Sequence, residues 1–408
     1  MKKEFITVFE KETVLRIQGC KIEAIRSKDI VKKGVRVFKD GMIGISGAVG
    51  DVADDLLVER AMENLATNIK YDYPLQGNHV ESRNYNPAPI TAKELIEHTE
   101  AILKELRENY TEFDFFENTG IREWKVQMRN TEGLDLTYED ALFSLSLILK
   151  EKGGPNVFDG FLAYQGRTFD REAFWHQNRE ILNAYRTKVS LPEGDRLPVF
   201  MLDFESLTGI LGRSLNGENY ATGSSLFKGK LGEKLFDDRV NVYQWGDSKA
   251  KFEPFFDREG CLTEGDKLPL IKNGKLESVF TDKRAAKLYD LPHTGAASGE
   301  YDGMPTLTSA ALRLDVDSVN IQEALNGQLA VLVVIAAGGE FTTDGSFASP
   351  VQVAFLFDGK NILGKLPEFG IRSDLYKLLG EDYIGTFENP LYFADESVMH
   401  GHYMEITK

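Results

Sequence analysis

The chain has 408 residues, of which 42% are hydrophobic and 27% charged, and this composition is typical of a soluble globular protein with two or three domains. Its net charge of −16 makes it a poor candidate for binding nucleic acid, because phosphate backbones are bound by clustered Lys and Arg. Two distant cysteines, Cys20 and Cys261, exclude a disulfide scaffold and indicate a reducing compartment. The N-terminus lacks the apolar core of a signal peptide, and no apolar run reaches the roughly 20 residues of a membrane span, so we expect a cytoplasmic protein.

The first half alternates predicted strands with predicted helices. Residues 34–45 predict a β-hairpin, because two β-prone runs flank the Asp-Gly pair at 40–41, a strong two-residue turn signal. A helix is predicted over residues 54–70, and Thr91 with Glu94 forms a capping box that opens the next one. The faces predicted to be buried carry Leu57, Ala61, Leu65 and Ile69 in the first helix and Leu95, Ile102, Leu103 and Leu106 in the second.

The rest of this half continues the alternation. Residues 124–128 alternate apolar with charged side chains, as in a half-buried strand, and residues 130–133 predict a turn. A helix is predicted over residues 137–152, and a further one over 170–185 with an aspartate cap. These elements together predict an α/β layer built on a mainly antiparallel sheet. The side chains expected to point inward from the two helices are Leu142, Leu145, Leu149, Ile181 and Leu182.

A domain boundary is predicted at residues 191–198, LPEGDRLP, where prolines, glycine and charge combine. It divides the chain into an N-terminal α/β domain, 1–190, and a C-terminal β-rich domain, 191–408. Residues 206–215 predict a short helix, and from about residue 241 strands separated by Asn-Gly and Asp-Gly turns dominate. The fold class is therefore α+β, with a curled or barrel-like sheet expected in the second domain.

The histidines do not form a recognised metal motif. None of the six belongs to H-E-x-x-H or H-E-x-x-x-H, the helical spacings that aim two imidazoles at one ion. His400 and His402 would share a face in a strand, but their place near the end of the chain favours an exposed tail over a ligand pair. Asp203 and Glu205 alone make a poor zinc site, and Asp203 is expected to cap a helix. We therefore expect no metal in this chain.

Nucleophilic and phosphate motifs are also missing from the sequence. No G-x-S-x-G elbow occurs, although a serine approached in space by one of the histidines stays open. Cys261 lies in a predicted turn between strands and is expected to be structural. The run from Gly223 to Lys230 is not a P-loop, because its glycines are six apart and Leu231 replaces the hydroxyl residue that would hold magnesium.

Ordered short signatures in the second half resemble the TldD/PmbA family. The first is SLFKGKLG at 225–232, followed by FDREG at 256–260 and LIKNGKL at 270–276. The same order continues with TDKRAAKL at 281–288, GSFA at 345–348 and FLFDGK at 355–360. Weaker matches in the first half are GVRV at 34–37 and NTEGL at 130–134, so the resemblance covers roughly residues 31–380.

The resemblance implies a heteromeric zinc protease in which only one of two branches binds the metal. The TldD-like branch carries H-E-x-x-x-H in a helix just before the first signature, and a later cysteine. Here the corresponding residues 206–215 read SLTGILGRSL, and no cysteine follows Cys261. The chain therefore resembles the PmbA-like branch, also called TldE. It departs from the family in a shortened loop between Leu215 and Gly223, and in HTGAA at 293–297 where the usual pattern is STGNA.

The expected function is that of a non-catalytic subunit of a TldD/PmbA-type zinc metalloprotease acting on unfolded peptides. The resemblance implies a TldD-like zinc-bearing partner or a homodimer, with zinc on the partner and no catalytic residue in this chain. Peptide capture by strand addition is expected at a sheet edge. The residues expected to line the peptide site are Ser225, Phe227, Gly338 and Gly339.

Two alternatives stay open at the level of sequence. Members of the family have been called modulators of DNA gyrase, so this acidic chain is a candidate for direct contact with that enzyme. An independent metallopeptidase with unusual ligands, including His400 and His402, is the other.

Overall fold

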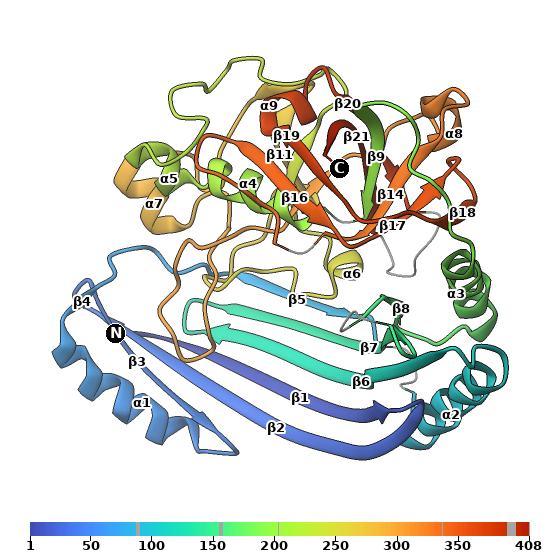
Figure 1. Cartoon of the computed structure of the whole chain (residues 1–408). Helices are drawn as coiled ribbons and strands as arrows, with labels where there is room; N and C mark the ends of the chain where they lie inside the picture. Colours follow the sequence, from blue (N-terminus) through green and yellow to red (C-terminus); the bar gives the residue numbers. More distant parts are fainter. Residues whose placement is uncertain (87–89, 155–157, 203, 337, 390–396, 408) are drawn as a thin grey trace.

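The computed structural model describes residues 1–86, 90–154, 158–202, 204–336, 338–389 and 397–407. An open eight-stranded sheet forms the first half, and two further sheets form the second half (Figure 1). The α+β prediction is confirmed, but the expected barrel-like closure is not found, because the sheets stay open. No helix in the described ranges has the length and apolar character needed to cross a membrane.

The first sheet has the order β4-β3-β2-β1-β6-β7-β5, and β8 also pairs with β7. Its pairs are antiparallel except for β5 with β7. The predicted hairpin is confirmed, since Lys39 pairs with Met42 around a turn in which Asp40 and Gly41 both adopt positive φ. The strands are β1 (Lys2–Gln18), β2 (Lys21–Lys39), β3 (Met42–Val49), β4 (Ile69–Lys70), β5 (His79–Asn84), β6 (Phe113–Asn130), β7 (Leu134–Glu151) and β8 (Gly160–Gly166).

The helices of the first half mostly agree with the sequence. The capping box of Thr91 and Glu94 opens α2 (Ala92–Asn109), and the four leucine and isoleucine side chains predicted to be buried there are buried. Asp170 caps α3 (Arg171–Arg186) as predicted. The first predicted helix is shorter than expected: α1 covers Asp54–Glu63, and a 3-10 turn, η1 (Asn64–Thr67), follows it before the chain joins the sheet as β4.

The helix predicted over residues 137–152 is wrong, because this segment is the long strand β7. Leu145, Leu147 and Leu149 are buried while the residues between them are less so, which is the period of two of a strand. The spacing of Leu142, Leu145 and Leu149 matched one face of a helix as well. The segment forms a strand because it pairs with β6 along one edge and with β5 and β8 along the other.

The second half contains a nine-stranded sheet and a four-stranded sheet. The larger sheet has the order β15-β16-β19-β21-β9-β14-β17-β18, with β20 paired to β21, and the smaller one is β12-β11-β10-β13. Their strands are β9 (Arg196–Leu202), β10 (Val242–Trp245), β11 (Lys267–Lys272), β12 (Lys275–Leu276), β13 (Leu312–Leu314), β14 (Ala330–Ile335), β15 (Glu340–Phe341), β16 (Ser346–Val351), β17 (Val353–Phe357), β18 (Ile362–Lys365), β19 (Phe369–Asp374), β20 (Tyr383–Glu388) and β21 (Val398–Thr407).

Short helices surround these two sheets. The predicted helix at 206–215 is confirmed as α4 (Glu205–Leu215). The others are α5 (Gly217–Thr222), α6 (Ser248–Lys251), η2 (Glu264–Asp266), α7 (Lys283–Tyr289), α8 (Ile321–Leu325) and α9 (Leu375–Leu378). The boundary predicted at 191–198 stays a prediction.

The two halves meet across one face of the first sheet, where the side chains of β2 alternate. Val35 and Val37 pack against α1, whereas Gly34 and Arg36, which alternate with them, face the second half of the chain. Gly34 lies so close to the loop of Tyr301 that an added Cβ would meet the Tyr301 carbonyl oxygen at 1.8 Å. Beside it, the fully buried Arg36 pairs with Glu4 on β1 at 3.0 Å.

Arg36 also reaches across to the second half. Its Nη1 donates to the Arg258 carbonyl at 2.6 Å, and its Nε donates to the Gly303 carbonyl at 3.1 Å. One guanidinium therefore joins β1, β2 and two loops of the second half. These loops border the candidate site.

Candidate functional site

Helix α4 lies where the resemblance to the TldD/PmbA family predicts a zinc-binding helix. Its apolar face is buried in the core through Leu207, Ile210 and Leu211. Zinc in proteins is held by thiolates, imidazoles and carboxylates, and Glu205 is the one residue of this helix with such a group. The residues of α4 therefore do not fit a catalytic zinc ion. Asp203, predicted to cap this helix, lies outside the described residues, and the first residue before the helix is Phe204.

Two of the predicted peptide-lining residues are engaged in internal packing. The Ser225 hydroxyl donates to the Ser214 carbonyl at 2.5 Å and accepts from the Phe227 backbone N–H at 2.9 Å. The Phe227 ring is fully buried and packs edge-on against Phe236. These contacts tie the segment to the end of α4. The predicted contact of Ser225 and Phe227 with a peptide stays a prediction.

The predicted glycine pair lies between β14 and β15. Gly338 is exposed and has a φ of +92°, and the Gly339 carbonyl accepts from the Ser206 hydroxyl. An added Cβ at Gly339 would come within 2.1 Å of the Ser349 Cβ, so this glycine permits a close approach to β16. Whether the pair also contacts a peptide stays a prediction.

His400 and His402 are not in an exposed tail, so that prediction is wrong. Both lie on β21, which is an interior strand of the larger sheet paired with β9, and both are buried. His400 Nδ1 lies 3.1 Å from the Thr386 hydroxyl, and His402 Nδ1 lies 2.8 Å from the Leu378 carbonyl. Burial, with a smaller effect of His402, lowers the pKa of His400 to about 3, and burial lowers the pKa of His402 to about 4.

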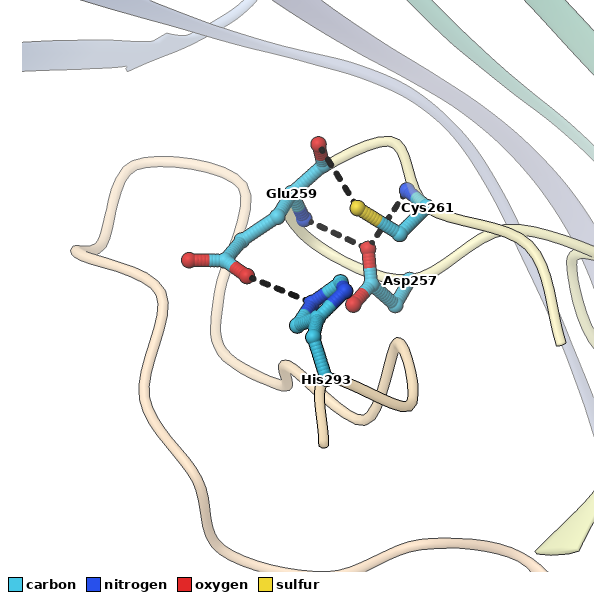
Figure 2. Close-up of side chains that lie close together, drawn as sticks. All are labelled: Asp257, Glu259, Cys261 and His293. Atoms are coloured by element: carbon cyan, nitrogen blue, oxygen red, sulfur yellow. Dashed lines mark hydrogen bonds and ion pairs between the residues drawn. The ribbon is translucent and has the colours of Figure 1, made fainter. Parts of the chain in front are cut away.

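Figure 2 shows a cluster that the sequence did not predict, formed by Asp257, Glu259, Cys261 and His293. One potential ligand atom from each of the four lies within 4.8 Å of the others. The first three come from a single turn at residues 257–261. His293 comes from the segment after α7. No other group of three or more such side chains was found within the described part of the chain.

Asp257 organises the turn. Its Oδ1 accepts from the backbone N–H groups of Glu259 and Cys261, each at 2.8 Å, and its Oδ2 accepts from the Ala297 N–H at 2.9 Å. Burial and the neighbouring Glu259 carboxylate raise the pKa of Asp257 to about 6, although these three donors favour its ionised form. Burial, together with Asp257, also raises the pKa of the Cys261 thiol, which is therefore a poor nucleophile by itself.

Glu259 connects the turn to both halves of the molecule. Its Oε1 accepts from the Tyr71 hydroxyl at 2.5 Å, and its Oε2 accepts from the Lys283 backbone N–H at 3.0 Å, with His293 Nε2 at 3.8 Å. Burial opposes ionisation of Glu259, but the His293 ring, the Tyr71 hydroxyl and Lys283 outweigh it and hold the pKa of the carboxylate below its usual value.

A cleft of about 640 Å³ opens beside this cluster, between the first sheet and loops of the second half. That volume lies within the range typical of ligand sites. Its lining combines aromatic rings with charges of both signs, and Asp257 and Cys261 contribute to its wall. Among the lining residues are Val8, Glu10, Arg122, Trp124, Trp245 and Phe252.

Sequence reasoning missed this site because its parts were assigned to other roles. In the sequence, Asp257 and Glu259 belong to the FDREG signature, Cys261 is expected to be structural, and His293 departs from the family's usual pattern. The available signal was the run of potential ligands at positions 257, 259 and 261, which lie within five residues and can be brought together by one turn. Nothing in the sequence places His293, 32 residues after Cys261, beside that segment.

Comparison with known proteins agrees with this architecture. Residues 203–398 match the family model of the PmbA/TldA metallopeptidase C-terminal domain. An uncharacterized protein of Methanocaldococcus jannaschii is 23% identical over 388 residues, covering 90% of this chain and 88% of that protein. A protein of Archaeoglobus fulgidus described as a metalloprotease is 24% identical over 392 residues, covering 91% of this chain and 88% of that protein.

Solved structures show the same fold over the whole chain. TldE from Thermococcus kodakarensis has a TM-score of 0.79 at 18% identity, covering 100% of this chain and 97% of that one. A putative modulator of a DNA gyrase from Thermotoga maritima has a TM-score of 0.77 at 18% identity, with 100% and 96% covered. The fold and the matched domain thus define a metallopeptidase-related α+β protein. The domain match over residues 203–398 and the shared fold support assignment of the chain to the TldD/PmbA family.

The two buried histidines predict a dependence of stability on pH. In the folded protein both imidazoles stay neutral to about pH 4, whereas in the unfolded chain each binds a proton near pH 6.5. Because the unfolded chain binds more protons below pH 6.5, the free energy of unfolding falls as the pH falls. When the pH is lowered from 7 to 5, we expect each histidine to reduce the free energy of unfolding by about 2 kcal/mol. Chemical unfolding at both pH values measures this change.

His400→Gln and His402→Gln should each reduce this pH-dependent loss by about 2 kcal/mol. His176→Gln is the matched control, because His176 is exposed on α3 and should leave the loss unchanged. An equal loss in wild type and His402→Gln would contradict the assignment of a neutral buried imidazole.

Proposed function

We propose that this chain is a non-catalytic, PmbA/TldE-like subunit of a TldD/PmbA-type zinc metalloprotease that acts on unfolded peptides. The observation that supports this most is the composition of α4. In a chain of this family, the helix at the position expected to bind zinc offers Glu205 as its one possible ligand. The Archaeoglobus relative is described as a metalloprotease, and the proposal gives this chain a role in such an enzyme without its metal centre.

The chemistry explains why a partner is required. A catalytic zinc site uses three protein ligands and one open position, where bound water becomes acidic enough to attack a peptide carbonyl. Helix α4 cannot provide three ligands, so this chain would not activate water there. The proposed partner is a TldD-like subunit with H-E-x-x-x-H, which would supply the zinc. A homodimer would lack catalytic zinc at this position in both copies.

The proposed role of this chain is to hold the peptide. The cleft between the first sheet and the loops of the second half suits an unfolded peptide, because its aromatic rings can cover apolar side chains while Glu10 and Arg122 offer charges to polar ones. Trp245 is partly exposed in this cleft, at the end of β10. The surface around Gly338 and Gly339 is a second proposed contact for the peptide.

Reconstitution with a partner tests whether peptidase activity requires a zinc-bearing subunit in addition to this chain. We expect the purified chain to hydrolyse no unfolded peptide alone, and peptidase activity to appear when a zinc-bearing TldD-like partner is added. Activity should be measured with an unfolded fluorogenic peptide across a titration of the partner. Replacing the glutamate of the partner's H-E-x-x-x-H with glutamine is the matched control, and it should abolish the activity. Peptidase activity in the lone chain would contradict the proposal.

A variant in the cleft tests where the peptide binds. Trp245→Ala should weaken peptide binding by about tenfold, since large aromatic side chains commonly dominate binding at such surfaces. Fluorescence anisotropy of a labelled unfolded peptide measures the affinity. Leu288→Ala, which truncates an exposed apolar side chain on α7, should leave the affinity unchanged. Equal affinity of Trp245→Ala and wild type would remove the cleft from the proposal.

A direct contact with DNA gyrase is the second candidate function. It draws on the net charge of −16 and on the description of the Thermotoga structure as a putative modulator of a DNA gyrase. A salt-sensitive association with purified gyrase in the absence of any protease partner would favour it, because long-range attraction between charged surfaces weakens with ionic strength.

A further inference from the structure

The cluster of Asp257, Glu259, Cys261 and His293 has the donor set of a metal site separate from α4. It offers one sulfur, one imidazole nitrogen and carboxylate oxygens from two side chains. Sites of magnesium and calcium use oxygen ligands, whereas a mixture of thiolate, imidazole and carboxylate suits zinc. The choice of ligands therefore points to a borderline-soft divalent ion.

The backbone around the cluster is fixed before any ion binds. Asp257 accepts from three backbone N–H groups, as described above, and this holds the turn in one conformation. The segment of His293 is held by Thr281, whose hydroxyl donates to the Pro292 carbonyl at 2.6 Å and whose N–H donates to the Thr294 hydroxyl at 2.8 Å. Hydrogen bonds to the Asp257 carboxylate therefore position the turn of Cys261, and hydrogen bonds of Thr281 position the segment of His293. None of these bonds uses the Cys261 sulfur or the His293 ring.

The distances are close to those of a tetrahedral site. Zinc bonds of about 2.0–2.3 Å place the ligand atoms of a tetrahedron about 3.3–3.8 Å apart. In this cluster the four ligand atoms lie within 4.8 Å of one another, so a contraction of at most about 1.5 Å would complete the geometry. His293 is partly exposed, with 35% of its side chain accessible, and gives an ion a path of entry.

We propose that Asp257, Glu259, Cys261 and His293 bind one zinc ion in a structural site at the junction of the two halves. Asp257 Oδ1 already accepts two backbone hydrogen bonds, but Asp257 Oδ2 accepts one, from Ala297, and Glu259 Oε2 accepts one from the Lys283 N–H, so each of these two oxygens has a second lone pair for the metal. The Cys261 thiol loses its proton to solvent when its sulfur bonds to the ion, and the ion replaces that proton as the partner of the sulfur.

The site is structural because four protein ligands fill a tetrahedron and leave no open position for water. It would join the turn at 257–261 to the segment of His293, and through the Tyr71 hydroxyl on Glu259 it would brace the first half of the chain. The proposal does not depend on the proposed function, since an ion held in this way leaves the chain without peptidase activity. Zinc binding and activity are therefore separate readouts.

Metal content and cobalt substitution test the site on the full chain. After incubation with zinc and desalting, we expect one zinc per chain by mass spectrometry of the metal. Cys261→Ser and His293→Ala should each weaken zinc binding at least tenfold. With cobalt as the probe, wild type should show a thiolate-to-cobalt charge-transfer band and intense visible bands of tetrahedral cobalt, and Cys261→Ser should lose the charge-transfer band.

Two matched controls make the result specific. Cys20→Ser removes the other buried cysteine, and His176→Ala removes an exposed histidine on α3, so both should bind metal like wild type. Because His293 is partly exposed, His293→Ala is expected to fold normally. It therefore tests the site even if Cys261→Ser, which changes a buried side chain, folds poorly. Wild type without retained zinc, or His293→Ala binding zinc as tightly as His176→Ala, would overturn the proposal. Peptidase activity of the lone chain would contradict the proposed function whatever the zinc content.

Discussion

The arrangement of this molecule depends on one buried cation. Arg36 lies on a strand of the first sheet, is fully buried, and has Glu4 on the neighbouring strand as its counter-charge. Its remaining hydrogen bonds go to the carbonyls of Arg258 and Gly303 in the second half. A buried ion pair adds little net stability, but removal of one partner leaves an uncompensated charge and typically costs about 3–5 kcal/mol. Arg36 therefore specifies how the halves fit together more than it adds to their stability.

The cleft and the cluster of potential metal ligands lie next to this contact. The Arg258 carbonyl that Arg36 binds belongs to the turn from Asp257 to Cys261, and the Tyr71 hydroxyl binds the same turn through Glu259. The cleft beside the first sheet and the four-residue cluster both include parts of this turn. The helix α4, by contrast, is built into the core and carries almost no group able to bind a metal. In this chain the four-residue group of potential metal ligands lies at the junction of the halves and not on the expected helix.

Local features of the fold could be predicted from the sequence because they depend on a few adjacent residues. The hairpin at Asp40-Gly41 and the capping box of Thr91 and Glu94 are of this kind. The helix predicted over 137–152 failed because leucines at 142, 145 and 149 satisfy a helical face as well as strand alternation, and only pairing with β5, β6 and β8 distinguishes the two. His400 and His402 were misplaced because position near the end of a chain says nothing about position within a sheet. The cluster with His293 depends on tertiary contacts, which a pattern of spacings does not contain.

Hydrogen–deuterium exchange in the turn at 257–261 tests most directly whether Arg36 holds the junction. The amides of Glu259, Cys261 and Ala297 donate to Asp257, so they report on the turn. In Arg36→Met these amides should exchange at least tenfold faster than in wild type, while strands β9 and β14 keep their protection. Arg16→Met is the control, because Arg16 forms an exposed pair with Glu23 and should leave exchange in the turn unchanged. Unchanged exchange in the turn of Arg36→Met would contradict this account.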